Sequence, residues 1–548
     1  MKKILPLLIL ILILNTYTNA QVPPPPPLQT GETWTGLYSV SYDYQTNGSI
    51  RYFVQNPANS SEYCTILMAQ QDSTATVGVG RYIYFAYSTD NGNSWSSDAL
   101  DVNFSWGFPD MSLRNGIPII AAHRFNTGSS VFQDASFGAF GFSQIPGVPL
   151  GTNWSHLTGT TNNNIVLVGA PNDNVFVGQS TTYNGTSWSP LISLPLVGGP
   201  SGNFSVESGA NGVVGIFGTN YINDGYLYWY KSTDNGVTFD NGTLIFDYLL
   251  EGTDTLFANI TGGLQASFKG SEPHIVFSAY NATLNVFPNQ YTTEFVKPKI
   301  LHWSPTTGIT QVAGKFNIPN LTDTITTALM TPLCQPSLNI TSSILSCTFT
   351  TFIRGNTQVV DDGSVLNAGE IFATYSENNG VTWKTPVNIT NTPGIEEKHS
   401  SLINNTVGAI QNPLKVYYLR DMKAGGWVNV AGFGKAPVYG IYKNANIYQI
   451  GIKYINSNAA SFNLSQNYPN PFNPSTTIKF DIPKSEFTTL SIYDINGREI
   501  SRIVNEKLNP GSYEYEFSAG DYNLSSGVYI YKLVSGNYSD TKRMILIK

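Results

Sequence analysis

The chain has 548 residues, of which 12% are charged and 13% aromatic, and its formal net charge is −7. One hydrophobic core rarely serves a chain of this length, so we expect two or more domains. The 50 glycines and 31 prolines favour many short strands joined by tight turns, and they exclude a mainly helical fold. The 29 basic residues form no basic stripe, so nucleic acid is not an expected partner.

The N-terminus has the pattern of a signal peptide, which we place at residues 1–20. Lys2 and Lys3 precede an apolar run over 4–14, and a small residue, Ala20, ends the segment. The apolar run has about eleven residues, fewer than the roughly 20 that cross a bilayer, so no transmembrane segment is expected. A proline-rich linker over 21–33 then leads to the body, which we place at residues 34–455.

Three octets that begin at Ser88, Ser232 and Ser376 repeat along the body. In each, Asp or Asn accepts backbone hydrogen bonds of its own turn, Gly supplies a positive φ, and an aromatic residue folds back over the turn. Alternating residues precede each octet, so each octet is expected to join two antiparallel strands. The shared positions are Ser88, Asp90, Gly92 and Trp95; Ser232, Asp234, Gly236 and Phe239; and Ser376, Asn378, Gly380 and Trp383. Weaker echoes occupy 181–188 and 304–311.

Further strand pairs fall between the octets and predict the inner hairpins of a repeated sheet. The fold class predicted for the body is therefore all-β, a six- or seven-bladed β-propeller, with a stacked β-sandwich as the alternative. The expected hairpins join 109–113 with 117–124, 202–208 with 212–219, 263–268 with 274–280, 335–340 with 345–354, and 399–403 with 414–420.

The octets resemble the Asp-box of the sialidase-like propellers. That resemblance implies that each octet joins the third and fourth strands of a blade, on the side away from the ligand-binding face. It also implies that the octets are structural. A Ca²⁺ site is not expected there, because each octet offers one carboxylate or none at its third position.

After a linker at 456–461, residues 462–548 change in character. Three prolines within 469–474 exclude a helix, and alternating strands follow, which predicts a C-terminal immunoglobulin-like β-sandwich. The segment resembles the type A C-terminal sorting domain of the type IX secretion system; the alternative is an ordinary adhesive module. The residues that carry this resemblance are Asn467, Tyr468, Pro469, Asn470, Pro471, Phe472, Asn473, Pro474, Gly497, Gly527 and Tyr529.

The sorting-domain resemblance implies where the protein works. The expected partners are the type IX secretion machinery and its sorting peptidase, and the expected location is the outer cell surface or the medium. Export through an oxidising compartment leaves open whether Cys334 and Cys347 form a disulfide. Cys64 is expected to be a small core residue.

The sequence offers few candidates for chemistry. The five histidines lack the spacing of a metal site, and no phosphate loop or nucleophile elbow occurs, so neither a metal nor a cofactor is predicted. Arg124, Arg354 and Arg420 each end a candidate second strand, and they are expected to share one face as a ligand-binding cluster. The alternative is that each pairs with a nearby carboxylate such as Asp421.

Asp110 and Glu397 are the candidate catalytic acids near the same rim, and the alternative is solvated loop charge. The Arg-Ile-Pro segment that begins sialidase domains is absent. The leading hypothesis is therefore a secreted or cell-surface propeller that binds glycans or proteins without catalysis. The alternatives are a polysaccharide-active glycosidase (sialidase-like) or lyase, and a structural surface protein or adhesin.

Overall fold

The computed structural model is built of strands. It describes residues 27–547 apart from 41–50, 71–79, 125–127, 152, 171–176, 198–203, 221–224, 253, 260–261, 282–296, 319, 323–330, 343, 362, 404–413, 425–435, 446, 448–451, 457–458 and 520–523. The expected signal peptide and the first part of the expected linker lie outside this range.

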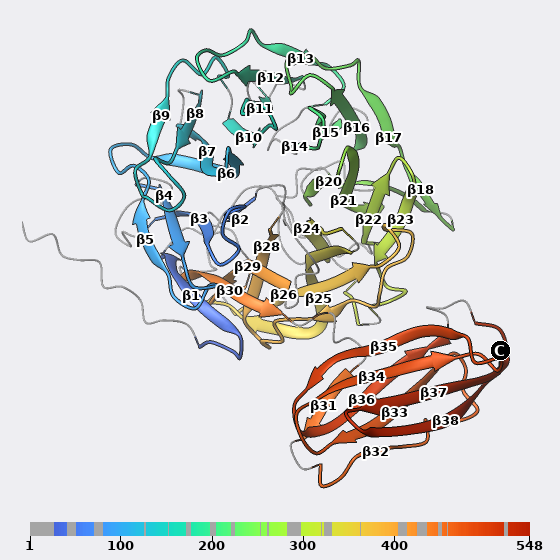
Figure 1. The fold of residues 1–548 in the computed structure, drawn as a ribbon. Coiled ribbons are helices and arrows are strands. Elements are labelled where there is room, and N and C mark those ends of the chain that lie inside the picture. Colours follow the sequence, from blue (N-terminus) through green and yellow to red (C-terminus); the bar gives the residue numbers. More distant parts are fainter. Residues whose placement is uncertain are drawn as a thin grey trace, which may run out of the picture.

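The described strands form nine sheets, of which seven stand in a ring, with one edge strand of each, such as β6, β14 or β28, toward the centre (Figure 1). This is the expected propeller, with seven blades. Blade 1 contains β2 (Phe53–Gln55), β3 (Tyr63–Ala69), β4 (Tyr82–Ser88) and β5 (Ser96–Ala99). Blade 2 contains β6 (Trp106–Arg114), β7 (Ile117–Arg124), β8 (Gly128–Gln133) and β9 (Ser143–Ile145). Blade 3 contains β10 (Asn153–Gly159), β11 (Ile165–Ala170), β12 (Gly178–Tyr183) and β13 (Ile192–Leu194).

The chain continues round the ring through four more blades. Blade 4 contains β14 (Phe204–Ser208), β15 (Val214–Asn220), β16 (Tyr226–Ser232) and β17 (Thr243–Phe246). Blade 5 contains β18 (Leu249–Glu251), β19 (Asp254–Ala258), β20 (Leu264–Lys269), β21 (Glu272–Asn281), β22 (Lys299–Ser304) and β23 (Gly308–Ala313). Blade 6 contains β24 (Leu333–Ile340), β25 (Leu345–Val359), β26 (Val365–Ser376) and β27 (Val387–Asn388). Blade 7 contains β28 (Glu396–Leu402), β29 (Leu414–Asp421), β30 (Val438–Ala445) and β1 (Glu32–Ser39).

Blade 7 closes the ring by combining both ends of the body. Its outer strand β1 comes from the N-terminal side of the body and pairs antiparallel with β30, from Glu32 opposite Lys443 to Ser39 opposite Val438. Ring closure leaves only short outer edges exposed, which is the physical advantage of a propeller over an open sheet. The apolar clusters of the body lie between neighbouring blades; one cluster joins residues of blades 7, 1 and 2.

The octets join third and fourth strands, as expected. The first lies between β4 and β5, the second between β16 and β17, and the third between β26 and β27. The weaker echoes lie at the same place in blades 3 and 5. The five expected inner hairpins are also present, as the pairs β6–β7, β14–β15, β20–β21, β24–β25 and β28–β29.

The C-terminal module is a separate two-sheet sandwich with its own core, drawn outside the ring in Figure 1. One sheet contains β31 (Ile452–Asn456), β36 (Gly511–Ser518), β33 (Ser475–Ile482) and β32 (Asn463–Leu464). The other contains β35 (Glu499–Leu508), β34 (Glu486–Tyr493), β37 (Gly527–Ser535) and β38 (Tyr538–Leu546). Pairing of β31 with β36 corrects the boundary expected at 455–456, because this strand completes the C-terminal sheet.

The cysteines are free and buried. Cys334 on β24 lies opposite Thr350, whereas Cys347 on β25 lies opposite Leu338, so the strand register separates the two thiols along the hairpin. The disulfide that the sequence left open is therefore not formed. Cys64 lies in the core beside blade 1, as expected.

Candidate functional site

The antiparallel order of each blade defines two faces of the ring. Turns between first and second strands lie on the same face as the octets, because both follow strands that run in the same direction. We call this the octet face. In agreement, Asn235 of the second octet donates its backbone N–H to Gly212 O, which belongs to a turn between first and second strands. The opposite face, where inner strands begin and second strands end, we call the rim face.

The inner strands of neighbouring blades are joined by a belt of hydrogen bonds around the axis. At most junctions a backbone N–H of one blade donates to an oxygen atom of the preceding blade. In that preceding blade, the residue that supplies the oxygen comes just before the residue at the donor's equivalent position. The bonds are Tyr52 N to Ser401 Oγ (3.1 Å), Met111 N to Arg51 O (3.2 Å), Leu157 N to Asp110 Oδ2 (2.9 Å), Ala266 N to Ser205 Oγ (3.0 Å), Leu338 N to Gln265 Oε1 (2.6 Å) and Leu402 N to Ser337 Oγ (2.9 Å). The acceptor residues are buried, so the belt fixes the blades at the axis.

A β-bulge precedes the belt in four blades. The pairing registers shift just before Asp110, His156, Ser337 and Ser401. Two residues before each of these, a non-glycine residue has a positive φ: Phe108 (49°), Trp154 (57°), Gln335 (55°) and His399 (54°). A left-handed non-glycine residue costs about 1 kcal/mol or more, and such residues gather at functional sites. The repeated bulges therefore mark the start of the inner strands, at the rim face.

A buried ionic cluster lies at the axis, below the bulges. Arg51, which precedes β2, donates hydrogen bonds to the Glu207 carboxylate and to Leu157 O, and its Nη2 lies 3.7 Å from Asp110 Oδ2. His156 Nδ1 also lies 3.7 Å from Asp110 Oδ2. Burial raises the pKa of Glu207 to about 7, although Arg51 opposes that shift. Sequence analysis missed Arg51, His156 and Glu207 as site residues; what they share is a position in, or just before, an inner strand.

Asp110 is enclosed rather than exposed at a rim. Its Oδ1 accepts the backbone N–H of Arg51 at 2.9 Å and its Oδ2 that of Leu157 at 2.9 Å, and the residue is 1% exposed. A carboxylate that accepts two backbone N–H groups and faces a guanidinium is committed to holding strands together. The alternative interpretation as solvated loop charge is wrong for Asp110.

Glu397 is also buried, in a different network. Its Oε1 lies 2.7 Å from Arg420 Nε and 2.5 Å from Arg420 Nη2. Arg420 in turn lies 3.0 Å from Glu32 Oε2 on β1, and its Nη1 donates to Pro27 O at 2.6 Å. Burial raises the pKa of Glu397 to about 7, against the attraction of Arg420. This network ties the closing strand β1 to the inner strand of blade 7. Solvated loop charge is therefore wrong for Glu397 as well.

The expected arginine cluster does not assemble as one site. Arg420 is fully buried in the network with Glu397 and Glu32, because closure of the ring brings β1 over it. The carboxylate partner is therefore not the adjacent Asp421, which pairs with Lys398 at 2.8 Å. Arg354 lies exposed on β25 in blade 6, and Arg124 ends β7 in blade 2. The rim-face positions of Arg124 and Arg354 agree with the expected strand register.

Arg124 belongs to an aromatic group on the rim face of blades 1 to 3, which we call the rim cluster. Its guanidinium lies 3.5 Å from the ring centroid of Phe104, a residue 40% exposed. Phe104 lies 6.2 Å from Trp106, centroid to centroid. A second layer behind them consists of Phe108, His123 and Trp154, whose ring centroids are 5.1 to 6.2 Å apart. Arg81 completes the cluster, 5.5 Å above the Phe108 ring.

His123 is held as a neutral hydrogen-bond acceptor in this cluster. Its Nδ1 accepts the backbone N–H of Trp154 at 3.1 Å. Burial lowers the pKa of His123 to about 3, so the ring is neutral at physiological pH with its proton on Nε2. The cluster therefore combines stacking surfaces with cationic side chains and contains no carboxylate among its members.

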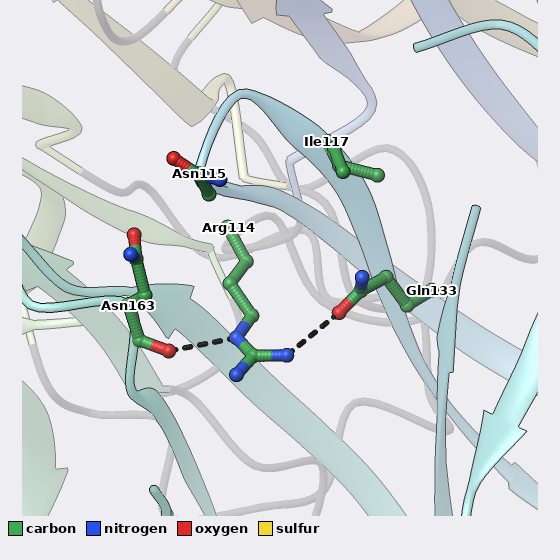
Figure 2. Close-up of a pocket in the computed structure, with 5 residues that line it drawn as sticks. All are labelled: Arg114, Asn115, Ile117, Gln133 and Asn163. Carbon is green, nitrogen blue, oxygen red and sulfur yellow. Dashed lines mark hydrogen bonds between the residues drawn. The ribbon is translucent and has the colours of Figure 1, made fainter. Parts of the chain in front are cut away.

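A small pocket of about 200 Å³ lies on the octet face, at the junction of blades 2 and 3 (Figure 2). Arg114 lines it: Nε donates to Asn163 O at 2.7 Å and Nη1 donates to Gln133 Oε1 at 2.9 Å. The same guanidinium lies 5.3 Å from the Tyr183 ring centroid. Arg114 thus links two blades. Asn115 and Ile117 complete the lining.

The octets have the hydrogen bonds expected of self-closing turns. Asp90 Oδ1 accepts the Ser94 N–H at 2.9 Å, and Ser88 Oγ accepts the Gly92 N–H at 2.9 Å. Equivalent bonds occur in the other two octets. A feature that the sequence did not predict is that each octet also packs on the preceding blade. Trp95 contacts Tyr442 with ring centroids 5.6 Å apart, and Trp383 contacts His302 at 5.5 Å.

Within the described residues, no group of three or more His, Cys, Asp and Glu side chains is placed to hold a metal ion. His274 and His302 do meet, with 2.9 Å between Nδ1 and Nε2, but no third described ligand is placed to hold a metal ion with them. The described part of the chain also contains no helix with the length and hydropathy of a membrane span.

Comparison with known proteins identifies the C-terminal module. Residues 466–548 match the family model of the secretion system C-terminal sorting domain. This confirms the expected sorting domain, and the protein is accordingly secreted or located at the outer cell surface. A search of curated proteins found no relative of this chain.

Solved structures with similar folds include several enzymes. A fungal alcohol oxidase of the AA5 family in complex with copper is 12% identical, covers 94% of this chain and all of its own, and has a TM-score of 0.43. A PL25 polysaccharide lyase, an ulvan lyase, is 9% identical over 75% of this chain and 94% of its own, with a TM-score of 0.38. The NanB sialidase of Streptococcus pneumoniae is 12% identical over 77% of this chain and 71% of its own, with a TM-score of 0.38.

Proposed function

We propose that this exported protein binds a glycan at the rim cluster and does not catalyse a reaction on it. The observation that carries the proposal is the platform of Phe104 and Arg124, partly exposed on the face opposite the octets. Loops at this face of a propeller surround the end of the axis, where a ligand meets several blades at once.

The chemistry of the platform suits a sugar. An aromatic ring offers an apolar face to the C–H groups of a pyranose, and a guanidinium beside it donates hydrogen bonds to hydroxyl or carboxylate oxygens. Trp106 supports the platform from behind and is itself fixed, because its Nε1 donates to Asp101 Oδ2 at 3.3 Å. A ligand would therefore meet a prearranged surface and lose little affinity to its reorganisation.

We propose that the protein is not catalytic because both candidate acids are buried and bonded to other groups of the chain. Asp110 is engaged by Arg51 and two backbone N–H groups, and Glu397 is engaged by Arg420. Glycoside hydrolysis needs two carboxyl groups flanking a bound sugar, about 5 to 10 Å apart, with access to it. A glycosidase or lyase that used Asp110 or Glu397 would have to break one of these buried networks first. A structural or adhesive role at the surface is compatible with binding and is the remaining alternative.

The test is binding of the full mature chain to a panel of neutral and acidic polysaccharides. Phe104→Ala is expected to weaken binding at least tenfold, because it removes the stacking surface. Val237→Ser, at an exposed position of the second octet, is the matched control and should bind like the unmodified protein. Equal loss in both variants, or binding only to protein ligands, would contradict the proposal. Release of reducing ends or unsaturated sugars by the purified protein would contradict its non-catalytic part.

A further inference from the structure

The opening of the sorting domain forms an exposed ridge between two buried anchors. Asn467 and Phe472 are each 2% exposed, and Phe472 packs in the sandwich core. Between them lie Tyr468, Pro469, Asn470 and Pro471, all exposed, with Tyr468 at 82%. We call residues 468–471 the tyrosine ridge. Tyr468 and the two prolines that follow it therefore form one contiguous exposed surface.

Hydrogen bonds on both sides hold the ridge in place. Asn467 donates its backbone N–H to the Tyr531 hydroxyl at 2.8 Å and its Nδ2–H to Thr476 Oγ1 at 2.9 Å. At the other end, Asn470 Oδ1 accepts the Ile545 N–H at 2.9 Å, and Phe472 donates to Ile545 O at 2.9 Å. The ridge is therefore fixed to the last strand, β38.

The Tyr468 side chain has no role in this framework. Its backbone exchanges two hydrogen bonds with Thr477, both 2.9 Å long, but no described residue forms a hydrogen bond or ring contact with its phenol. Folding therefore gains little from this ring. A rigidly placed, exposed tyrosine gives a partner a large contact area at a small entropic cost, which is how tyrosine acts at interface hot spots.

We propose that the tyrosine ridge is the surface by which the secretion machinery recognises this protein. The partner would be a protein with an apolar groove that accepts a tyrosine ring and the adjoining prolines. The proposal rests on the sorting-domain match over residues 466–548, which contains the ridge and gives the partner its role. It is independent of what the propeller binds.

The test is export of full-length variants in a bacterium with a type IX secretion system. Tyr468→Ala is expected to fold normally, with an unfolding temperature within about 2 °C of the parent, because the ring is exposed. Its surface fraction, measured by fractionation and protease accessibility, should fall at least tenfold, with accumulation in the periplasm. Phe487→Ala is the matched control, since Phe487 is 57% exposed on the same sandwich. The control should be exported like the parent.

Two results would overturn the proposal. One is normal export of Tyr468→Ala; the other is an equal loss in Phe487→Ala, which would show that any exposed ring matters. A chain truncated before β31 tests the premise separately, namely that the C-terminal domain directs export. If that truncated chain still reaches the surface, the sorting role of the domain is wrong. If only the truncation blocks export, the domain sorts through another surface.

Discussion

The guanidinium of Arg51 in blade 1 donates a hydrogen bond to the carboxylate of Glu207 in blade 4. The two residues are three blades apart in the ring, so this contact spans the axis rather than a single junction. The same guanidinium also reaches Leu157 O in blade 3 and approaches Asp110 in blade 2. One side chain therefore connects four of the seven blades.

Replacing Arg51 should destabilise the propeller strongly. Arg51→Met would leave the carboxylates of Asp110 and Glu207 buried without their cation, and breaking such a network costs about 3 to 5 kcal/mol. The measurement is the free energy of unfolding from denaturant titration. Arg354→Met is the control; because Arg354 is exposed, it should change that free energy by less than about 0.5 kcal/mol. Similar losses in the two variants would refute the role of the axial cluster.

The titration of Glu207 should appear in the pH dependence of stability. Burial raises its pKa in the folded protein to about 7, from an ordinary value of 4.5. Between these values the folded state holds a proton that the unfolded state has released, so the contribution of Glu207 to stability falls as pH rises from 4.5 to 7. Glu207→Gln removes this dependence. The parent should therefore lose stability relative to Glu207→Gln, by about 3 kcal/mol across this window.

The comparison with Glu207→Gln is needed because buried histidines act in the opposite direction. Burial lowers the pKa of His123 and His302 to about 3 and that of His274 to about 4. Their contribution is present above pH 6.5 and is lost as pH falls towards the folded pKa values. The histidine contributions are the same in the parent and in Glu207→Gln. They therefore cancel when the free energies of unfolding of the two proteins are subtracted at each pH. A difference that stays flat from pH 4.5 to 7 would show that Glu207 titrates normally.

Local chemistry explains which parts of this structure were predictable from sequence. An octet closes on itself through bonds such as Gly92 N to Ser88 Oγ, between residues four apart, so its motif is readable anywhere in a chain. The hairpins were likewise predicted from adjacent alternating segments. The closing pair of β1 and β30 joins residues about 400 positions apart, from Glu32 to Lys443, and no local pattern records that contact.

The candidate site was less predictable for the same reason. Asp110 and Glu397 were recognised as polar residues near the start of inner strands. The burial of Asp110 depends on Arg51, which comes from another blade, and that of Glu397 and its neighbour Arg420 depends on the closing strand β1. The bulges were missed because Phe108 and Trp154 hold a positive φ that sequence patterns assign to glycine or asparagine.

The cysteines give a direct test of the strand register in blade 6. Burial raises the pKa of all three thiols, and none is exposed to reagent in the folded chain. Protein exported through the oxidising periplasm should therefore show no reactive thiol when native and three after denaturation without reductant. A count of one reactive thiol per chain after denaturation would mean that Cys334 and Cys347 are bridged, and that the register of β24 against β25 is wrong.

The packing of each octet on the preceding blade predicts an unequal cost of two glycine substitutions. Gly92 and Gly147 both have a positive φ, 81° and 74°, so alanine at either position should cost about 1 kcal/mol in backbone strain. At Gly147 the added methyl group meets nothing within 4 Å, whereas at Gly92 it would overlap the Tyr442 ring of blade 7. Overpacking adds about 1 to 3 kcal/mol. Gly92→Ala should therefore lower the free energy of unfolding clearly more than Gly147→Ala, and equal losses would show that the octet does not clamp the two blades.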